Sequence, residues 1–370
     1  MSCRESIAKL RGLPLRIKRR VRRVSRYFVA AFTNKALIKV IMQVPGARID
    51  PSFDPDRVKQ YAAVGQCIYC GASGSSVELR REHILAYSLG GDAILPAASC
   101  PTCADITSEF EKYCADHIFL SVRVQHNIHS RRPEPTHLPI LETFAPEPHL
   151  APKVLVPVDD HPGVLILPSF DPPGMVSGRA PTVGSGLVMH FWRITNDYDQ
   201  RIQRLHDAGI KGVKIHEQIA LKPFLRMLAK IAHGMAVADY GIDGFRPLLI
   251  DVILKGDPSA PYFVGSATDR TPPSEPMKTW ARTEVRSIGN KKYVVAFFRL
   301  FAYLGTPVYS VVVGERMDSL TRLKRAVKRS LVALGKVIRP LRVVSGHRPA
   351  VSPPSHRRPS RSCAISALRS

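Results

Sequence analysis

Four cysteines in two close pairs are the residues whose types and spacing point most directly to chemistry. Cys67 and Cys70 form one Cys-x-x-Cys pair and Cys100 and Cys103 form another, which gives the pattern C-x2-C-x29-C-x2-C. Each pair can make a tight turn that directs two thiolates at one ion, and two such turns complete the tetrahedral shell that Zn²⁺ favours. We therefore predict a structural Zn²⁺ site with these four ligands. The gap of 29 residues exceeds the roughly 15–20 of a plain zinc ribbon, so a further segment is inserted between the pairs.

The cysteine usage also indicates a compartment. The chain has seven cysteines, an odd number, and the central four are paired closely instead of being spread along the chain as in a disulfide framework. This pattern favours a reducing environment and a bound metal, so we expect a cytoplasmic protein. No run of eighteen apolar residues is present, so we expect no membrane span. The first residues lack the apolar core and cleavage site of a secretory signal, but their Arg-rich, acid-poor composition also fits an organellar transit peptide.

The inserted segment carries an acidic residue, a histidine and two glycines. It reads "REHILAYSLGG", with Glu82, His83, Gly90 and Gly91, and the second cysteine pair follows in "ASCPTCADITSEFE". In this order and spacing the residues resemble the HNH nuclease family of the ββα-metal superfamily, in its zinc-bound form with two Cys-x-x-Cys pairs. The resemblance covers about fifty residues. It implies that the acidic-His pair ends a first strand, that the Gly-Gly lies in the loop before a second strand, and that the second cysteine pair opens a helix.

The resemblance implies a role for each residue of the acidic-His pair. Hydrolysis of a phosphodiester needs a water that is deprotonated near neutral pH and a cation that offsets the charge developing on the phosphate. His83 is the expected general base, because the unperturbed pKa of histidine suits that role; the alternative is a structural imidazole in the hairpin. Glu82 points to the opposite face of the strand and is a candidate ligand for a catalytic Mg²⁺ or Mn²⁺, which prefer oxygen. A zinc ion held by four thiolates has no open position and only stabilises the fold.

Two positions depart from the family pattern. Family members commonly carry Asn or His directly after the last cysteine as a metal ligand, and Ala104 stands there. An Asn that often braces the active-site loop is also missing, and Pro96 and Ala97 occupy its place.

Acidic residues farther along the expected helix are the candidate replacements for the missing ligand. Asp105 follows Ala104 directly, and Glu109 comes one helical turn later. Glu111 is a weaker candidate because it lies farther along. Each of them is equally compatible with a solvated acid near a helix N-terminus, where negative charge is favourable.

The charge of the chain predicts a polyanionic partner. The formal net charge is +24, from 54 Lys and Arg against 30 Asp and Glu, and such a surface attracts nucleic acid. The predicted phosphate contacts are four arginines of the N-terminal arm together with Arg81, which precedes the acidic-His pair: Arg19, Arg20, Arg22, Arg23 and Arg81. A solvated basic helix or a disordered arm is the alternative for the first four.

We predict an α+β protein in four parts. A basic N-terminal arm spans 1–50, an HNH-like zinc module 60–120, an α+β domain of unknown role 150–315, and a basic, largely disordered tail 316–370. The Pro-rich segment between the second and third parts is expected to be an extended connector with short strands.

Within the third part, alternating and continuous apolar runs predict strands and one clear helix. The helix is expected over 221–241, where apolar residues recur with helical period and Gly241 sits at the C-terminal cap. The strands are expected in the runs "GVLILP", "GLVMHFWRI", "LLIDVIL", "PYFVGSA", "KYVVAFFRLFAYLG" and "TPVYSVVVGE". His190, His216 and His233 stand at no ligand spacing and are expected to be ordinary core or surface residues.

Three functions compete at this level. The first is a metal-dependent HNH-type endonuclease that hydrolyses phosphodiester bonds in DNA, with basic tails that add sequence-independent affinity. The second is a catalytically inactive zinc module that binds nucleic acid. The third is a zinc unit that braces an α+β domain with another role, such as sensing or protein interaction. Glu82 and His83 favour the first, since a purely structural ribbon does not need that pair.

Overall fold

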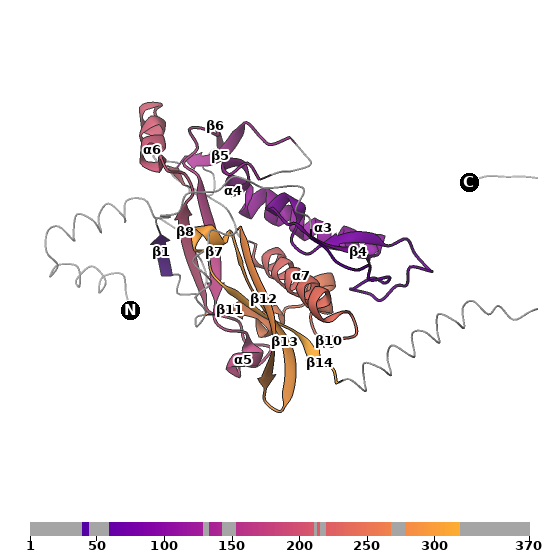
Figure 1. The fold of residues 1–370 in the computed structure, drawn as a ribbon. Helices are drawn as coiled ribbons and strands as arrows, with labels where there is room; N and C mark the ends of the chain where they lie inside the picture. Colours follow the sequence, from indigo (N-terminus) through magenta and orange to yellow (C-terminus); the bar gives the residue numbers. More distant parts are fainter. Residues whose placement is uncertain are drawn as a thin grey trace, which may run out of the picture. The chain divides into compact units, whose positions relative to one another are not determined.

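Helix α7 (Leu221–Tyr240) is a long, largely buried helix that packs against both helices and strands (Figure 1). The computed structural model describes residues 39–43, 59–128, 133–142, 153–210, 213–214, 220–267 and 278–318. On one side α7 contacts helix α3 (Pro101–Tyr113) of the cysteine segment, and on another it contacts strands β13 (Lys291–Leu300) and β14 (Tyr309–Arg316). Helices and sheets both make up the described chain, so the predicted α+β class is confirmed.

The predicted helix is present because its apolar residues repeat at helical spacing. Phe224, Leu228 and Ile231 are almost completely buried and lie on faces that α3 and the sheet cover. The helix ends where Gly241 adopts a φ of 69°, a conformation that glycine reaches without steric cost, and its amide donates to the Val237 carbonyl. The predicted C-terminal boundary is therefore confirmed.

The described strands form four sheets. A five-stranded antiparallel sheet has the order β10-β14-β13-β12 with β11 also pairing to β14. A three-stranded sheet has the order β1-β8-β7, with β1 parallel to β8. Two smaller sheets have the orders β2-β4-β3 and β6-β5-β9. The strand bounds not yet given are β1 (Lys39–Gln43), β2 (Lys59–Gln60), β3 (Arg80–His83), β4 (Ala93–Ser99), β5 (His137–Glu142), β6 (Lys153–Pro157), β7 (Val164–Phe170), β8 (Leu187–Arg193), β9 (Val213–Lys214), β10 (Phe245–Pro247), β11 (Val264–Ser266) and β12 (Thr279–Ile288).

Short helices connect these strands. The π-helical turn η3 follows α3 directly, and η2 lies between β3 and β4. The bounds are η2 (Tyr87–Leu89), η3 (Cys114–Ile118), α4 (Leu120–Gln125), α5 (Gly174–Ser177), α6 (Tyr198–Asp207), α8 (Ile250–Lys255), α9 (Ala260–Phe263) and η5 (Ala302–Leu304).

One hydrophobic core joins the cysteine segment to the sheet. The same cluster of buried side chains contains Cys67 and Leu95 of that segment, Phe224 of α7, and Phe298 and Val311 of the five-stranded sheet. All described residues belong to one compact unit. The segments 60–120 and 150–315, which the sequence predicts as different parts, thus bury apolar side chains in one shared core.

Most of the predicted strands are present, and two predictions were wrong in whole or in part. The run "LLIDVIL" contains helix α8 instead of a strand, because Leu249, Val252 and Ile253 have helical spacing and point into the core. Gly256, with a φ of 66°, ends that helix. In "PYFVGSA" the first residues belong to α9, and the strand β11 begins only at Val264.

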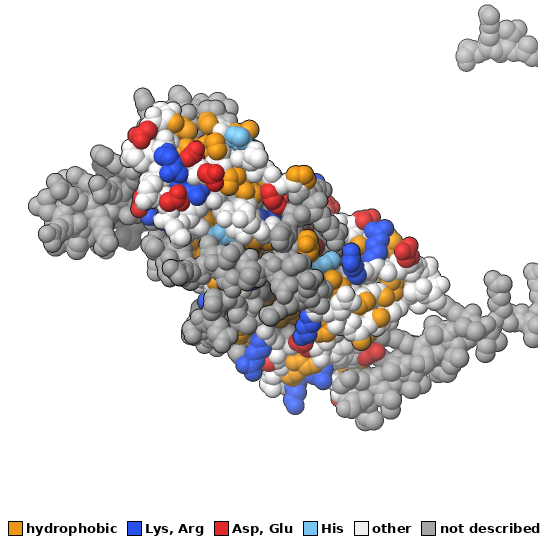
Figure 2. Space-filling view, turned by 45° about the horizontal axis from the view of Figure 1, so that its top comes forward, with side chains coloured by type: hydrophobic (Ala, Val, Ile, Leu, Met, Phe, Trp, Pro, Cys, Tyr) orange, Lys and Arg blue, Asp and Glu red, His pale blue; other side chains and the backbone are white. Residues whose placement is uncertain are grey.

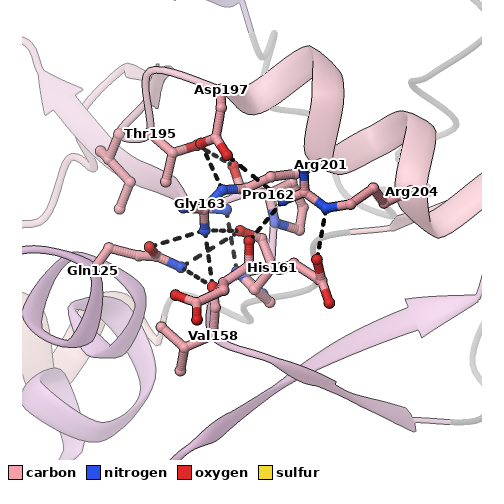
Figure 3. Close-up of polar contacts among 12 residues, drawn as sticks. Gln125, Val158, His161, Pro162, Gly163, Thr195, Asp197, Arg201 and Arg204 are labelled. Carbon is pink, nitrogen blue, oxygen red and sulfur yellow. Dashed lines mark hydrogen bonds and ion pairs between the residues drawn. The ribbon is translucent and has the colours of Figure 1, made fainter.

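A polar network fixes helix α6 against the turn that follows β6 (Figure 3). The guanidinium of Arg201 donates to the carbonyls of Val158 and His161 at 2.8 and 3.0 Å. It also donates to Asp197 at 2.6 Å and to the Gln125 side chain of α4 at 3.1 Å. Because Arg201 and Gln125 both donate to the carbonyls of Val158 and His161, this network is a structural brace.

No helix in the described part of the chain has the length and apolar character needed to cross a bilayer.

Candidate metal centre and active site

The four predicted zinc ligands come together in space. The Sγ atoms of Cys67, Cys70, Cys100 and Cys103 all lie within 4.8 Å of one another, and those of Cys70 and Cys100 are 3.6 Å apart. Cys70 is exposed, whereas the other three are buried. This arrangement suits a tetrahedral tetrathiolate site, so the residues fit a structural zinc ion.

Local backbone structure explains why each pair converges. In the first pair, the amide of Cys67 donates to the Ala72 carbonyl, and the amide of Gly71 donates back to the Cys67 carbonyl at 2.9 Å. Gly71 has a φ of 76°, which closes the turn without the strain that a side chain would bring. In the second pair, Cys100 is the N-cap of α3 and Pro101 occupies the first helical turn, where its missing N–H costs nothing.

Burial opposes ionisation of Cys67 and Cys103 in the absence of a metal, whereas at the exposed Cys70 desolvation is outweighed by hydrogen bonds that lower the pKa. Desolvation raises the pKa of Cys67 and the pKa of Cys103 above the usual value for a thiol. A metal ion must therefore displace protons when it binds, and its positive charge supplies the stabilisation that the buried thiolates lack.

The order of elements around the cysteines is strand, strand, helix. Strand β3 ends at His83, β4 pairs with it antiparallel, and α3 begins directly after Cys100. Gly90 and Gly91 lie in the loop between the two strands. The three positions that the family resemblance implied for these elements are therefore present, in the β-β-α order.

Backbone conformation and close packing explain why glycine stands at both positions of the pair. Gly90 adopts a φ of 80° at the end of η2. A Cβ on Gly91 would lie 1.9 Å from the carbonyl oxygen of Leu85, so no side chain fits at that position. The Gly-Gly motif thus shapes the loop that brings β4 back alongside β3.

Glu82 lies in a buried ion-pair cluster instead of facing solvent. Its side chain is 7% exposed, and its Oε1 lies 2.8 Å from the Nζ of Lys230 in α7. The same ammonium lies 2.8 Å from Oε1 of Glu111 in α3 and also donates to the backbone carbonyl of His83. Lys230 itself is 1% exposed. Removing one partner of a buried ion pair costs about 3–5 kcal/mol, so these charges depend on one another.

The pKa values follow from this burial. Desolvation lowers the pKa of Lys230, but Glu111 and Glu82 outweigh it and raise the pKa above its usual value. Desolvation raises the pKa of Glu111, and the charge of Lys230 counters this only in part. The phenol of Tyr69 is buried beside the cluster, and burial together with the charges of Glu82 and Glu111 raises its pKa. The cluster is consequently a low-dielectric environment in which a charge is stable only when paired.

His83 lies on the opposite face of β3 from Glu82, as expected from the alternation of a strand. It is half-buried, and its ring lies 6.2 Å from that of Tyr87 in an edge-on orientation. An imidazole in this position is closer to solvent than the carboxylate beside it.

The other predicted ligands lie apart from Glu82. Asp105 is exposed, and its carboxylate lies 3.8 Å from the guanidinium of Arg80. Glu109 is also exposed and lines a surface hollow together with Arg226 and Tyr113. Ala104 donates its amide to the Cys100 carbonyl and offers no ligand atom. Among the described residues, the four cysteines are the one group of His, Cys, Asp and Glu that converges as metal ligands do.

The predicted catalytic divalent ion therefore does not fit the described residues. Glu82, Asp105 and Glu109 do not converge, and the carboxylate of Glu82 is already neutralised by Lys230. No protein family matches the chain, and neither curated proteins nor solved structures show a significant similarity to it. The chemistry of the site thus rests on the geometry of these side chains alone.

Sequence reasoning missed Lys230 and the hydrogen bond of His233. The ring of His233 is buried, and its Nε2 donates to the Ile68 carbonyl at 2.8 Å, inside the first cysteine turn. A signal was available for Lys230, because it is a lone charge in the otherwise apolar run "MLAKIAHGMAVA". A lysine in such a run is rarely buried unless an acidic partner accompanies it.

The predicted nucleic-acid contacts are divided between described and undescribed residues. Arg81 is exposed at the start of β3, whereas Arg19, Arg20, Arg22 and Arg23 lie outside the described residues. On the face shown in Figure 2, Lys and Arg side chains are interspersed with Asp and Glu. The first 58 residues contain 14 Lys and Arg against 4 Asp and Glu, and the last 52 contain 13 against none, so the two ends hold nearly all of the net charge of +24.

Proposed function

We propose that this protein is an HNH-type endonuclease that hydrolyses phosphodiester bonds in DNA, with His83 as the general base. The observation that carries the proposal is the position of His83 at the end of β3, in a strand-strand-helix unit that four clustered cysteines hold together. The cysteines would bind one structural zinc ion and keep β3 and α3 in a fixed relation. In this scheme the zinc does no chemistry, because four thiolates leave it no open position.

His83 would remove a proton from the water that attacks the phosphorus, the P–O bond to the leaving sugar oxygen would break, and that oxygen would take a proton from solvent. A positioned general base contributes roughly 10²–10⁴-fold to a rate. Lys230 holds the carbonyl of His83, which restrains the backbone from which the imidazole extends. Mg²⁺ or Mn²⁺ would supply the cation that offsets the charge on the phosphate; the described carboxylates do not converge on one position, so no residue is assigned to hold it.

The basic ends of the chain would supply affinity. Lys and Arg that neutralise phosphates release condensed counterions, so binding should weaken steeply with salt and depend little on sequence. Arg81, exposed on the same strand as His83, would add one contact near the site. Reduced cysteines are required for the metal, which fits a cytoplasmic protein.

A second function, nucleic-acid binding without cleavage, is favoured by one specific observation. Glu82 is paired with Lys230, and Ala104 stands where a further ligand is common in the family that the segment resembles. A module that has lost its catalytic cation would keep the zinc fold and the basic ends.

Cleavage of supercoiled plasmid by the zinc-loaded full-length protein distinguishes the two functions. The assay is run with Mg²⁺, with Mn²⁺ and with EDTA, and zinc content is measured after each incubation to confirm that the structural ion stays bound. The matched variants are His83→Ala and His117→Ala, since His117 is an exposed histidine of η3 outside the proposed site.

For the endonuclease, we expect nicking by the wild type and by His117→Ala, and a loss of at least about 10²-fold in His83→Ala. If none of the proteins nicks the plasmid while binding of labelled duplex persists, the non-cleaving function replaces the first. A protein that neither cleaves nor binds would contradict both.

A further inference from the structure

The ammonium of Lys230 sits inside a cage of oxygen atoms. Oε1 of Glu82 and Oε1 of Glu111 each lie 2.8 Å from Nζ. The carbonyl of His83 accepts from the same nitrogen, and the carbonyl of Ile84 lies 3.4 Å away. Strand β3 and the residue after it supply three of these oxygens, and α3 supplies the fourth, so the cation joins the two elements of the zinc-bound unit.

The composition of the cage is that of a divalent-cation site. Carboxylate and carbonyl oxygens are the donors that Mg²⁺, Mn²⁺ and Ca²⁺ prefer. An ammonium group has three N–H donors and no acceptor; here it donates to the carbonyls of His83 and Ile84 and forms ion pairs with Glu82 and Glu111. A second cation cannot share the cage, since it would place two positive charges within a few ångströms in a buried region.

We infer that Lys230 is the resident cation of this cage, and that it excludes a divalent metal ion from Glu82. The side chain takes the place that a soluble ion would fill, and its single positive charge pairs with both buried carboxylates. Only one consequence rests on the proposed function: hydrolysis by His83 would proceed without a metal ion bound to Glu82. The ion pairs of Lys230 with Glu82 and Glu111 do not depend on whether the protein cleaves DNA.

The packing around Lys230 gives its ammonium group a defined place in the core. Lys230 is 1% exposed, and the helix that carries it contacts α3 directly. One turn later, a Cβ on Gly234 would lie 3.4 Å from the Ile84 side chain, so α7 approaches the end of β3 closely. A long side chain from this helix therefore reaches the cage without leaving the core.

Manganese binding tests the inference without reference to cleavage. Free Mn²⁺ is followed by electron paramagnetic resonance as it is titrated into the zinc-loaded full chain. We expect the wild type and Glu82→Gln to give the same binding curve, because Glu82 is not open to Mn²⁺ in either protein. A wild-type site that Glu82→Gln abolishes would overturn the inference.

Removing the ammonium should open the cage. We expect Lys230→Ala to gain about one Mn²⁺ site per chain, and its melting temperature to rise with added Mn²⁺, since a ligand that binds only the folded state stabilises it. Lys230→Ala combined with Glu111→Gln is the matched control, and it should lose the added site. A folded Lys230→Ala protein that gains no site would contradict the inference.

The test also covers the case in which Lys230→Ala fails to fold. If Lys230→Ala does not fold in buffer, it is refolded with and without Mn²⁺, and the comparison of wild type with Glu82→Gln decides the outcome if both attempts fail. Failure of the proposed nuclease activity would leave these binding curves unchanged, so the two proposals fail separately.

Discussion

His233 of α7 donates a hydrogen bond of 2.8 Å to the carbonyl of Ile68, the residue that follows the first cysteine of the cluster. The helix thus holds the cysteine segment at two points, because Lys230, less than one turn earlier, holds the end of β3. The other ring nitrogen of His233 is buried and finds no hydrogen-bond partner among the described residues. A proton added there would be a buried charge without an acceptor.

This geometry predicts a loss of stability in acid. Burial lowers the pKa of His233 from 6.5 to about 4. The unfolded chain binds the proton first, so the stabilisation is fully present above about pH 6.5 and is lost as the pH falls towards about 4. For one such histidine the loss is at most roughly 3 kcal/mol. We expect His233→Gln, which keeps a donor for Ile68, to remove this part of the pH dependence in urea unfolding between pH 4 and 7.

The matched control is His206→Gln, since His206 is an exposed histidine of α6. It should keep the pH profile of the wild type. His161 is also buried, with a pKa lowered to about 4, so part of the acid sensitivity must survive in His233→Gln. A His233→Gln profile that is identical to the wild type would show that His233 is not buried neutral.

The amount of bound zinc should depend on the four clustered cysteines and not on Cys114. We expect about one zinc per chain in the wild type, a loss of bound zinc in Cys100→Ser, and unchanged zinc in Cys114→Ala, because the buried thiol of Cys114 lies outside the cluster. Removal of the ion should expose the backbone amides of β3, β4 and α3 to hydrogen exchange, as metal and folding are coupled in such sites. Elemental analysis and exchange mass spectrometry provide the two readouts; zinc retained by Cys100→Ser would contradict the assignment.

Gly91→Ala should destabilise the protein through a steric clash. The added Cβ would lie 1.9 Å from the Leu85 carbonyl, so the loop between β3 and β4 must move. Overpacking of this kind typically costs about 1–3 kcal/mol. Gly184→Ala is the control, since a Cβ there has no atom within 4 Å. Urea unfolding compares the two, and equal midpoints would mean that the loop is not as tightly closed as the structure has it.

Ala97→Gly should stabilise the protein. Ala97 has a φ of 48°, at the irregularity where the register of β3 and β4 shifts. A left-handed conformation costs a non-glycine residue roughly 1–2 kcal/mol, and glycine adds roughly 0.5–1 kcal/mol of chain entropy to the unfolded state. The expected net gain is up to about 1 kcal/mol, measured by thermal unfolding.

The comparison for Ala97→Gly is the adjacent buried Ala98. Ala98→Gly removes a packed methyl group without relieving any strain, so it should lower the melting temperature. A decrease for both variants would argue against the left-handed backbone at Ala97.

The sequence was sufficient for features that depend on short spacing. Each Cys-x-x-Cys pair consists of residues close together in the chain, and this spacing predicted the cysteine cluster. A regular repeat of apolar residues predicted α7. The sequence was insufficient where a side chain meets a partner far away. Glu82 looked available for a metal because its partner Lys230 lies in a helix that the spacing of the cysteines does not involve.

Ambiguous local signals explain the remaining differences. The run that forms α8 is short and apolar, and such runs suit a strand and a buried helix equally well. Ala97 shows the same limit in the backbone, since nothing in its residue type indicates a positive φ. The tertiary structure decides both cases.

Because α7 carries Lys230 and His233, the order of biosynthesis constrains how the zinc-bound segment matures. The cysteines, β3 and α3 leave the ribosome well before α7, and until then Glu82 and Glu111 lack the ammonium that neutralises them. A nascent chain that ends before Leu221 would therefore expose this unfinished face, where a chaperone or a protease can act on it. The roughly fifty residues that resemble a nuclease module accordingly share their core and their buried ion pairs with α7.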